Sequence, residues 1–401
     1  MIINKPELLE INDPLIGLKG YLAIDSLVNN RCCGGLRASP DVSADEMRKL
    51  AHLMTLKYGF LGLPHGGAKA GIVFDERTGA SKAELLGAFM RQVRRQLGDY
   101  VYTPHPDVGT DNKEICAMLV SAGINIPKRA VVSEKSGWYT SLTVIASIKA
   151  ASLSSGLNLK QSSAAVAGFG KVGSAVAEGL DKMGVKVLAI STSEGALYRK
   201  EGLDIPRLIA LSREFKSNLV HHYKEAQKLD KDKLVELDVD ILSPCAVGNC
   251  IHSKNAARVK SRMIVAGANN PISDEAYDML YQQGIAVMPD FISNAGGVLG
   301  GTMQFAGIEE KEIIDFIDND FLEQARIFIA EAAEKGLGLY ALAEAAAYGR
   351  FLRLKTACEK RSISNRIFSW ALEFYRNGIM PKSAVSLLSK RYFRRRIQGR
   401  L

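Results

Sequence analysis

The 401-residue chain lacks the features that mark secreted and membrane proteins. Its six cysteines follow no framework spacing, and the adjacency of Cys32 and Cys33 disfavours a structural disulfide between them. No uninterrupted apolar run is long enough to cross a bilayer, and the N-terminus has no basic-then-apolar signal pattern. We also find no internal repeat and expect no metal site. These absences predict a cytoplasmic protein with reduced thiols and no membrane partner.

The positive charge of the chain is concentrated at one end. The formal net charge is +9, but residues 390–401 carry six basic residues and no acidic one, so the rest of the chain carries only +3. This distribution argues against nucleic acid as a partner, because a binding surface would spread its charge over a domain. We interpret the basic tail as a solvated end or a contact between subunits.

The length predicts two domains, and a hydrophobic content of 47% suits a globular core. The first part mixes short strands with amphipathic helices, two of which begin at predicted capping boxes, Ser43 with Glu46 and Ser81 with Glu84. We expect residues 1–140 to form an α/β substrate and oligomerisation domain. Helices within residues 340–401 are expected to complete it.

From about residue 140 the pattern changes to alternating strands and helices, which is typical of a doubly wound parallel sheet. We therefore expect residues 141–339 to form a Rossmann-like dinucleotide-binding domain, followed by a helical C-terminal segment. A cleft between the two domains is the expected place for a substrate. The candidate strands are residues 163–168, 185–191, 239–242, 263–267 and 285–288.

A glycine-rich loop joins the first of these strands to a helix. It follows the GxGxxG pattern, which lets the backbone approach a pyrophosphate at the N-terminus of the helix. The alternative is a glycine-rich turn that binds nothing, which the strand–loop–helix–strand order makes the weaker reading. The candidate cofactor residues here are Gly168, Phe169, Gly170, Lys171, Val172 and Gly173.

The following strand ends at Thr192, where an acid normally binds the adenosine ribose. A hydroxyl there tolerates a 2′-phosphate better than a carboxylate does, and Lys171 would help. Glu194 could still reach the ribose. We expect NAD or NADP as the cofactor, with a mild preference for NADP.

Two lysines and one aspartate are the candidate catalytic groups. Lys57 falls on the apolar face of a helix, in phase with Leu50, where a lysine needs a partner. Lys69 lies in a glycine-rich turn, and a neighbouring cation together with burial would lower its pKa and make it a base near neutral pH. Asp107 follows in a turn. Taken singly, Lys69 reads as a surface lysine and Asp107 as an ordinary turn residue.

Eight ordered sequence blocks make the chain resemble the glutamate/leucine/phenylalanine/valine dehydrogenase family. The resemblance implies oxidative deamination of an amino acid by an enzyme that is a homo-oligomer. The blocks are residues 34–37, 54–57, 66–69, 106–110, 168–173, 243–246, 266–269 and 289–298.

The same resemblance implies roles by position. Lys57 matches the lysine that holds the substrate α-carboxylate, within a binding region that includes Gly34 and Gly35. Lys69 matches the lysine that activates water and stabilises a carbinolamine, and Asp107 matches the acid that exchanges protons with the amino nitrogen. The remaining matches are Thr140 near the nicotinamide carboxamide, and Asn269 and Asn294 on the cofactor and substrate sides.

Two departures from the family pattern concern the substrate side chain. Glutamate enzymes place a lysine at the position of Cys33 and a serine at that of Gly301, and both contact the side-chain carboxylate. A carboxylate buried without its cation is penalised strongly, so we expect a neutral amino acid with a branched or aromatic side chain. Two alternatives stay open: a glutamate dehydrogenase anchored by Arg37 or His65, and a catalytically idle sensor or scaffold.

Overall fold

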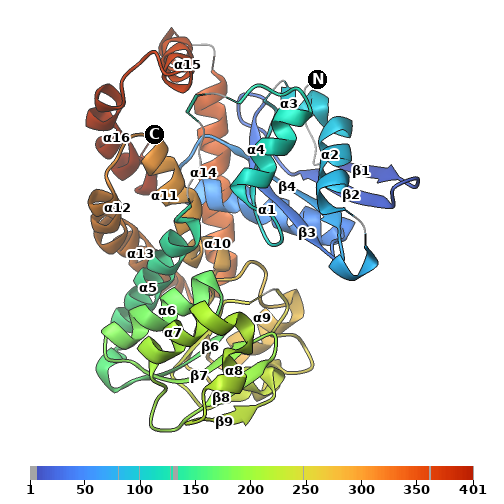
Figure 1. The fold of residues 1–401 in the computed structure, drawn as a ribbon. Coiled ribbons are helices and arrows are strands. Elements are labelled where there is room, and N and C mark those ends of the chain that lie inside the picture. The colour runs from blue at the N-terminus through green and yellow to red at the C-terminus, as the bar shows by residue number, and fades with distance from the viewer. Residues whose placement is uncertain are drawn as a thin grey trace. The chain divides into compact units, whose positions relative to one another are not determined.

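The computed structural model divides into two compact units, which are described separately (Figure 1). Unit 1 comprises Met1–Glu134, Phe305–Ile308 and Ala346–Leu401, and unit 2 comprises Lys135–Gln304 and Glu309–Ala345. The structure describes residues 7–79, 81–98, 100–126, 128–129, 134–246, 248–360 and 363–400.

Unit 1 is built on a five-stranded mixed sheet with the order β1-β2-β4-β3-β5. β1 and β2 form an antiparallel hairpin, and β2 is also antiparallel to β4. β3 runs parallel to both β4 and β5, so these three strands begin at the same edge of the sheet. The strands are β1 (Glu7–Asp13), β2 (Leu18–Ile24), β3 (Cys32–Ser39), β4 (Gly66–Val73) and β5 (Tyr102–Pro106).

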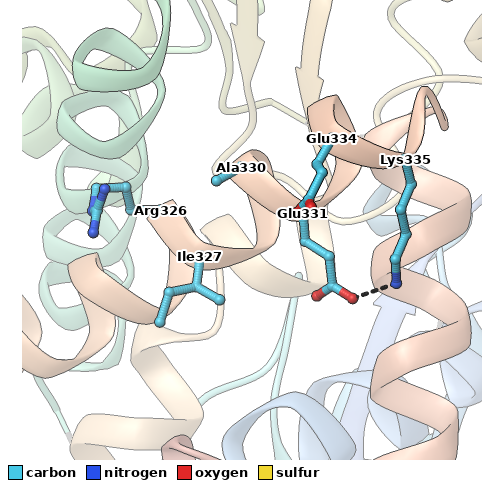
Figure 2. Close-up of a pocket in the computed structure, with 6 residues that line it drawn as sticks. All are labelled: Arg326, Ile327, Ala330, Glu331, Glu334 and Lys335. Carbon is cyan, nitrogen blue, oxygen red and sulfur yellow. Dashed lines mark hydrogen bonds and ion pairs between the residues drawn. The ribbon is translucent and has the colours of Figure 1, made fainter.

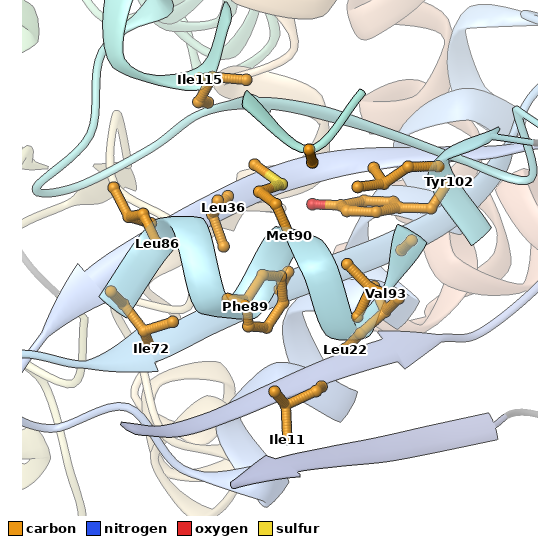
Figure 3. Close-up of a cluster of buried hydrophobic side chains, with 14 of the residues drawn as sticks. Ile11, Leu22, Leu36, Ile72, Leu86, Phe89, Met90, Val93, Tyr102 and Ile115 are labelled. Atoms are coloured by element: carbon orange, nitrogen blue, oxygen red, sulfur yellow. The ribbon is translucent and has the colours of Figure 1, made fainter. Parts of the chain in front are cut away.

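Side chains alternate between the two faces of β3, β4 and β5, as strand geometry requires. Even-numbered residues such as Leu36, Ile72 and Tyr102 enter a hydrophobic core with Phe89 and Met90 of α2 (Figure 3). Odd-numbered residues face the other side, where ideal Cβ atoms at Gly67 and Gly71 of β4 would meet α1. The helices of unit 1 up to this point are α1 (Ala44–Leu61), α2 (Lys82–Gln92), α3 (Arg94–Gly98) and α4 (Asn112–Ser121).

Only half of each predicted capping box is present in α1 and α2. The Ser43 hydroxyl accepts a hydrogen bond from the Glu46 amide, at 3.3 Å, and Ser81 does the same for Glu84. The Glu46 carboxylate pairs with Arg37 instead of returning to its own helix start. The first turn of α1 is thereby tied to β3.

The C-terminal segment is helical, as predicted, and its basic end is packed rather than a solvated tail. α16 buries Phe393 and Ile397, and Arg350 donates to the Ile397 carbonyl at 3.0 Å. The tail arginines at 391, 394 and 395 remain exposed on the outer face of the helix. The last helices are α14 (Leu339–Glu359), α15 (Ile363–Arg376) and α16 (Lys382–Ile397).

Unit 2 contains a seven-stranded sheet with the order β12-β11-β10-β6-β7-β8-β9. Five strands are parallel, and they match the five predicted from the sequence. Two antiparallel strands, β8 and β9, were not predicted: the chain reverses after β7 at Ser193 and Glu194. The strands are β6 (Ser163–Ala167), β7 (Lys186–Thr192), β8 (Gly195–Tyr198), β9 (Gln227–Leu229), β10 (Ile241–Pro244), β11 (Met263–Val265) and β12 (Ala286–Met288).

Helices surround the sheet of unit 2, and the predicted Rossmann-like α/β class is confirmed. No helix within the described residues is both long and apolar enough to span a membrane. The helices are α5 (Ser136–Ser155), α6 (Lys171–Lys182), α7 (Ile205–Phe215), α8 (Leu219–His222), α9 (Asp274–Gln282), α10 (Asp290–Ser293), α11 (Gly296–Phe305), α12 (Glu310–Phe316), a π-helical turn (Ile317–Phe321) and α13 (Leu322–Lys335).

Two helix-interior glycines in unit 1 provide a matched test of this packing. A Cβ at Gly59 of α1 would lie 2.1 Å from the Ala347 carbonyl oxygen of α14, whereas a Cβ at Gly87 of α2 would meet nothing closer than 3.4 Å. We expect Gly59→Ala to lower the free energy of unfolding by about 1–3 kcal/mol or more through overpacking. Gly87→Ala should be neutral or stabilising by up to about 1 kcal/mol. Denaturant titration measures both, and equal effects would contradict the close approach of α1 and α14.

Candidate active site

Lys69 and Asp107 meet on the odd-numbered face of the unit 1 sheet. The Lys69 ammonium donates to Asp107 Oδ2, and both side chains are largely buried. The pair lies directly over Gly35, because an ideal Cβ there would be 3.1 Å from Lys69 Nζ and 2.8 Å from Asp107 Oδ2. Any side chain at position 35 would therefore displace the pair. The structure thus gives Gly35 a steric reason to be glycine.

The turn after β5 fixes the position of Asp107. The Asp107 amide donates to Thr110 Oγ1 at 3.0 Å, and this hydroxyl donates to the Leu36 carbonyl of β3 at 2.7 Å. Val108 also accepts from the Ala38 amide at 2.9 Å. The Pro-Asp-x-Gly turn is therefore locked to the strand that lies under the lysine.

Arg37 is a member of the site that the sequence interpretation considered only as a substrate anchor. Its guanidinium is buried, pairs with Glu46, and lies 3.6 Å from Asp107 Oδ1. Arg37 follows Gly35 by two residues and so shares its face of β3. The alternation of side chains along β3 could have predicted Arg37 from the sequence. Its ion pair with Glu46 depends on tertiary packing, which the sequence does not show.

The electrostatic surroundings make Lys69 an unusual lysine. Burial lowers the pKa of Lys69 well below its ordinary value, and the positive charges of Arg37 and Lys57 lower it further. Glu46 acts in the opposite direction. Lys57 is itself buried on α1. The structure therefore brings Lys57, Lys69 and Asp107 together, with Arg37 beside them.

Positions 33 and 34 lie on opposite faces of β3, because successive residues of a strand alternate between its two faces. The thiol of Cys33 lies on the site face, where it interacts with His105 and with Tyr58 of α1. Burial raises the pKa of Cys33, but the charge and hydrogen bond of His105 outweigh it and bring the pKa below its ordinary value. Gly34 serves packing, because a Cβ there would lie 1.6 Å from the Ala68 carbonyl oxygen of β4.

In unit 2 the glycine-rich loop lies where the strand order reverses, between the ends of β6 and β10. Gly168 has φ +104°, and a Cβ there would be 2.6 Å from the Ala246 amide nitrogen. A Cβ at Gly173 would lie 1.8 Å from the Gly168 carbonyl oxygen. Both glycines are therefore required for the tight turn and the close helix packing of a dinucleotide loop. The Gly168 amide donates to Ser191 Oγ at 3.0 Å.

The N-terminus of α6 has the properties of a phosphate site. Gly170 is its N-cap residue, provides no side-chain cap, and has open space where a Cβ would be. Lys171 and Val172 begin the helix, and the preceding Phe169 is buried. The first-turn amides of a twelve-residue helix thus face an uncrowded position, which suits a pyrophosphate.

Two predicted asparagines of unit 2 lie in contact. Asn294 Nδ2 donates to Asn269 Oδ1 at 2.9 Å and to the Ala268 carbonyl at 2.8 Å. Asn294 Oδ1 is buried and has no hydrogen-bond partner among the described residues. Buried acceptors are normally satisfied, so this oxygen fits a donor from a bound ligand. With the loop at Gly168, it makes unit 2 a good fit for a nicotinamide dinucleotide.

The remaining predicted residues of unit 2 are less directly tied to a ligand. Thr140 is buried on α5 and donates to the Ser136 carbonyl at 3.0 Å. Gly301 is buried within α11. The Thr192 hydroxyl donates to the Ser217 carbonyl at 2.8 Å and accepts from the Glu194 amide at 3.1 Å. The hydroxyl proton of Thr192 is therefore used within the chain, and the expected tolerance of a 2′-phosphate at this position stays a prediction.

A surface hollow of about 590 Å³ in unit 2 is lined by none of these residues (Figure 2). It follows the exposed side of α13, and the Glu331–Lys335 ion pair lies on one turn of the same helix. It contains no group placed in the candidate site. We therefore assign it no part in the chemistry.

Comparisons with known proteins agree with this geometry. Residues 133–361 match the family model described as Glutamate/Leucine/Phenylalanine/Valine dehydrogenase, and residues 9–122 match the dimerisation domain of Glu/Leu/Phe/Val dehydrogenases. A hetero-hexameric glutamate dehydrogenase from Thermus thermophilus has a similar fold, with a TM-score of 0.74 and 23% identity over 90% of each chain.

Two curated relatives are similar in sequence. A glutamate dehydrogenase from Thermotoga maritima is 34% identical over 296 residues, which is 70% of each chain. An NADP-specific glutamate dehydrogenase from Saccharolobus shibatae is 33% identical over 295 residues, covering 70% of this chain and 69% of the relative. These relatives do not support the expected neutral-side-chain branch. Together with the family models, they show that the chain belongs to the Glutamate/Leucine/Phenylalanine/Valine dehydrogenase family and is an NAD(P)-dependent amino acid dehydrogenase acting on a CH–NH2 donor.

Proposed function

We propose that the chain catalyses oxidative deamination of L-glutamate to the 2-oxo acid and ammonia, or the reverse reductive amination. The observation that carries the chemistry is the Lys69–Asp107 pair, buried beside Lys57 on one face of β3, β4 and β5. The choice of glutamate is supported by the names of the sequence relatives. The intact lysine–aspartate arrangement favours an enzyme over an idle scaffold.

Each of the three residues has a distinct task in this proposal. Lys57 binds the substrate α-carboxylate as a buried cation. The chemistry that NAD(P) supplies when bound is acceptance of the hydride from the substrate Cα. Lys69, with its lowered pKa, takes a proton from the water that attacks the resulting imino carbon. Asp107 takes a proton from the substrate ammonium before hydride transfer and returns it to the nitrogen of the carbinolamine. The C–N bond then breaks and the ammonia leaves with the hydroxyl proton, so that the 2-oxo acid remains.

The residues of unit 2 would orient the dinucleotide. We infer that the first-turn amides of α6 hold the pyrophosphate, and that Asn294 Oδ1, which the resemblance places on the substrate side, instead accepts from the nicotinamide carboxamide. Thr140 and Asn269 would line the same region. Lys171 remains the cation that favours NADP, whereas the exposed Glu194 favours NAD. The preference for NADP thus depends on Lys171 and on the absence of a carboxylate at the position of Thr192.

A neutral amino acid is the second candidate, and it is favoured by two observations. Cys33 offers a buried thiol where a glutamate enzyme has lysine, and Gly301 offers no side chain at all. Neither anchor considered from the sequence replaces the missing charge. Arg37 is already paired with Glu46 and Asp107, and burial lowers the pKa of His65 to about 4, so His65 is neutral at pH 7.

The wider setting is also a proposal. We infer a cytoplasmic homo-oligomer, because the six cysteines are free and residues 9–122 match a dimerisation domain. We further assign substrate binding to residues 1–140 with 340–401, and cofactor binding to residues 141–339.

A substrate panel with both cofactors tests the choice of amino acid. We expect kcat/KM for glutamate to exceed that for leucine, valine, phenylalanine and tryptophan by at least about tenfold, since the sequence relatives are glutamate enzymes. Initial-rate assays with NAD and NADP measure it. A clear preference for a branched or aromatic substrate would overturn glutamate in favour of the second candidate.

Substitution Lys69→Ala tests the chemistry. We expect kcat to fall by about 10²–10⁴-fold, because a general base is lost. The cofactor dissociation constant should be unchanged, since the loop at Gly168 belongs to unit 2. Lys19→Ala, at an exposed lysine of β2, is the matched control. An unaltered kcat in Lys69→Ala would remove Lys69 from the mechanism.

A further inference from the structure

A group of basic residues lies at the edge of the sheet where β3, β4 and β5 begin. Arg31 immediately precedes β3, and His65 immediately precedes β4. The Arg31 carbonyl accepts from the Gly66 amide at 3.1 Å, and the Cys32 amide donates to Val101 at 2.6 Å, just before β5. The starts of the three parallel strands are therefore held together by backbone hydrogen bonds.

Arg376 reaches this edge from the end of α15. Its guanidinium carbon lies 5.0 Å from the centre of the Tyr100 ring, two residues before β5. Its carbonyl accepts from the Arg129 amide at 3.0 Å, which fixes the end of the helix. Burial lowers the pKa of Arg376, the charge of Arg31 lowers it further, and Cys33 acts in the opposite direction. Arg376 is thus within electrostatic reach of both Arg31 and Cys33.

The distance along β3 between the catalytic pair and this basic edge is about the length of one amino acid side chain. Lys69 and Asp107 lie over Gly35, and Cys33 lies on the same face of β3, two residues or about 6.6 Å nearer the edge. A substrate that reacts at the pair and extends along β3 would pass Cys33 with its distal end. Arg31 directly precedes β3 at this edge, and Arg376 is within electrostatic reach of Cys33.

The other groups around Cys33 do not supply the same charge. His65 is neutral, because burial and the nearby cations lower its pKa to about 4. Burial lowers the pKa of His105, but interaction with Cys33 outweighs it and raises the pKa above its ordinary value, so His105 is engaged by the sulfur atom it faces. Glu373 lies on the same helix as Arg376, and its negative charge acts to raise the pKa of Arg376. Within the described residues, neither Arg31 nor Arg376 forms an ion pair with a carboxylate.

We propose that Arg376, assisted by Arg31, binds the side-chain carboxylate of the substrate at the edge of the sheet beyond Cys33. This assignment rests on glutamate being the substrate and names the anchor that replaces the missing lysine. A guanidinium presents paired donors that match a carboxylate. The anchor comes from the C-terminal helices rather than from the strand that carries the lysine in other members.

The experiment compares Arg376→Gln and Arg376→Lys with Arg353→Gln, which changes an exposed arginine of α14. We expect Arg376→Gln to raise KM for glutamate by about tenfold or more. The kcat/KM for norvaline, which has no side-chain charge, should stay within about twofold, and Arg376→Lys should recover part of the loss for glutamate. Arg353→Gln should change neither substrate. Thermal unfolding of each variant identifies loss of fold.

Two outcomes separate the anchor from the proposed function. If the unmodified chain turns over glutamate and Arg376→Gln leaves its KM unchanged, or changes glutamate and norvaline equally, the anchor is overturned and the function stands. If the unmodified chain does not turn over glutamate, the proposed function fails. Calorimetric binding of glutarate then tests the anchor alone: tenfold weaker binding in Arg376→Gln supports it, and equal binding overturns it.

Discussion

The contact between the Lys69 ammonium and the Asp107 carboxylate is the interaction on which the account of unit 1 depends. This contact requires glycine at position 35, where a side chain would displace the pair. It also requires the turn that Thr110 ties to β3, and the buried Arg37 next to Asp107. Burial and the two cations make a neutral Lys69 easier to form, while the carboxylate keeps a proton nearby. An amine and an acid that share a proton in this way suit a reaction in which protons move between water and an amino nitrogen.

The alternation of side chains along β3, β4 and β5 gives the two faces of the unit 1 sheet different roles. Even-numbered residues make the core with α2, and odd-numbered residues carry the polar groups toward α1. A shift of one residue in the strand register would exchange the two sets. The core and the site therefore specify each other, because the register that buries Leu36 and Ile72 also places Lys69 opposite Asp107.

Local patterns in the sequence predicted much of the fold, and they named residues that the structure brings together in the candidate site. The loop from Gly168 to Gly173 was predictable because its strand, turn and helix are contiguous, and Lys57 because its helical phase is regular. Contacts between distant segments were not predictable. The pairing of Arg37 with Glu46 depends on how α1 lies on β3, and the engagement of Thr192 depends on the chain reversal into β8. The helical packing of the basic tail likewise depends on its buried Phe393 and Ile397.

Direct titration of Lys69 measures whether burial and the neighbouring cations lower its pKa. In a chain with isotope-labelled lysine side chains, the Lys69 resonance is assigned by its loss in Lys69→Ala, and its chemical shift is followed with pH. The account predicts that Lys69 titrates well below the ordinary lysine pKa of 10.5, and that its pKa rises in Lys57→Met because a neighbouring positive charge is removed. Since only the neutral amine is a base, that rise would move the acidic limb of the activity profile to higher pH. If Lys69 titrates in the same pH range as the exposed lysines, or if its pKa is unchanged in Lys57→Met, burial and the charge of Lys57 do not lower its pKa.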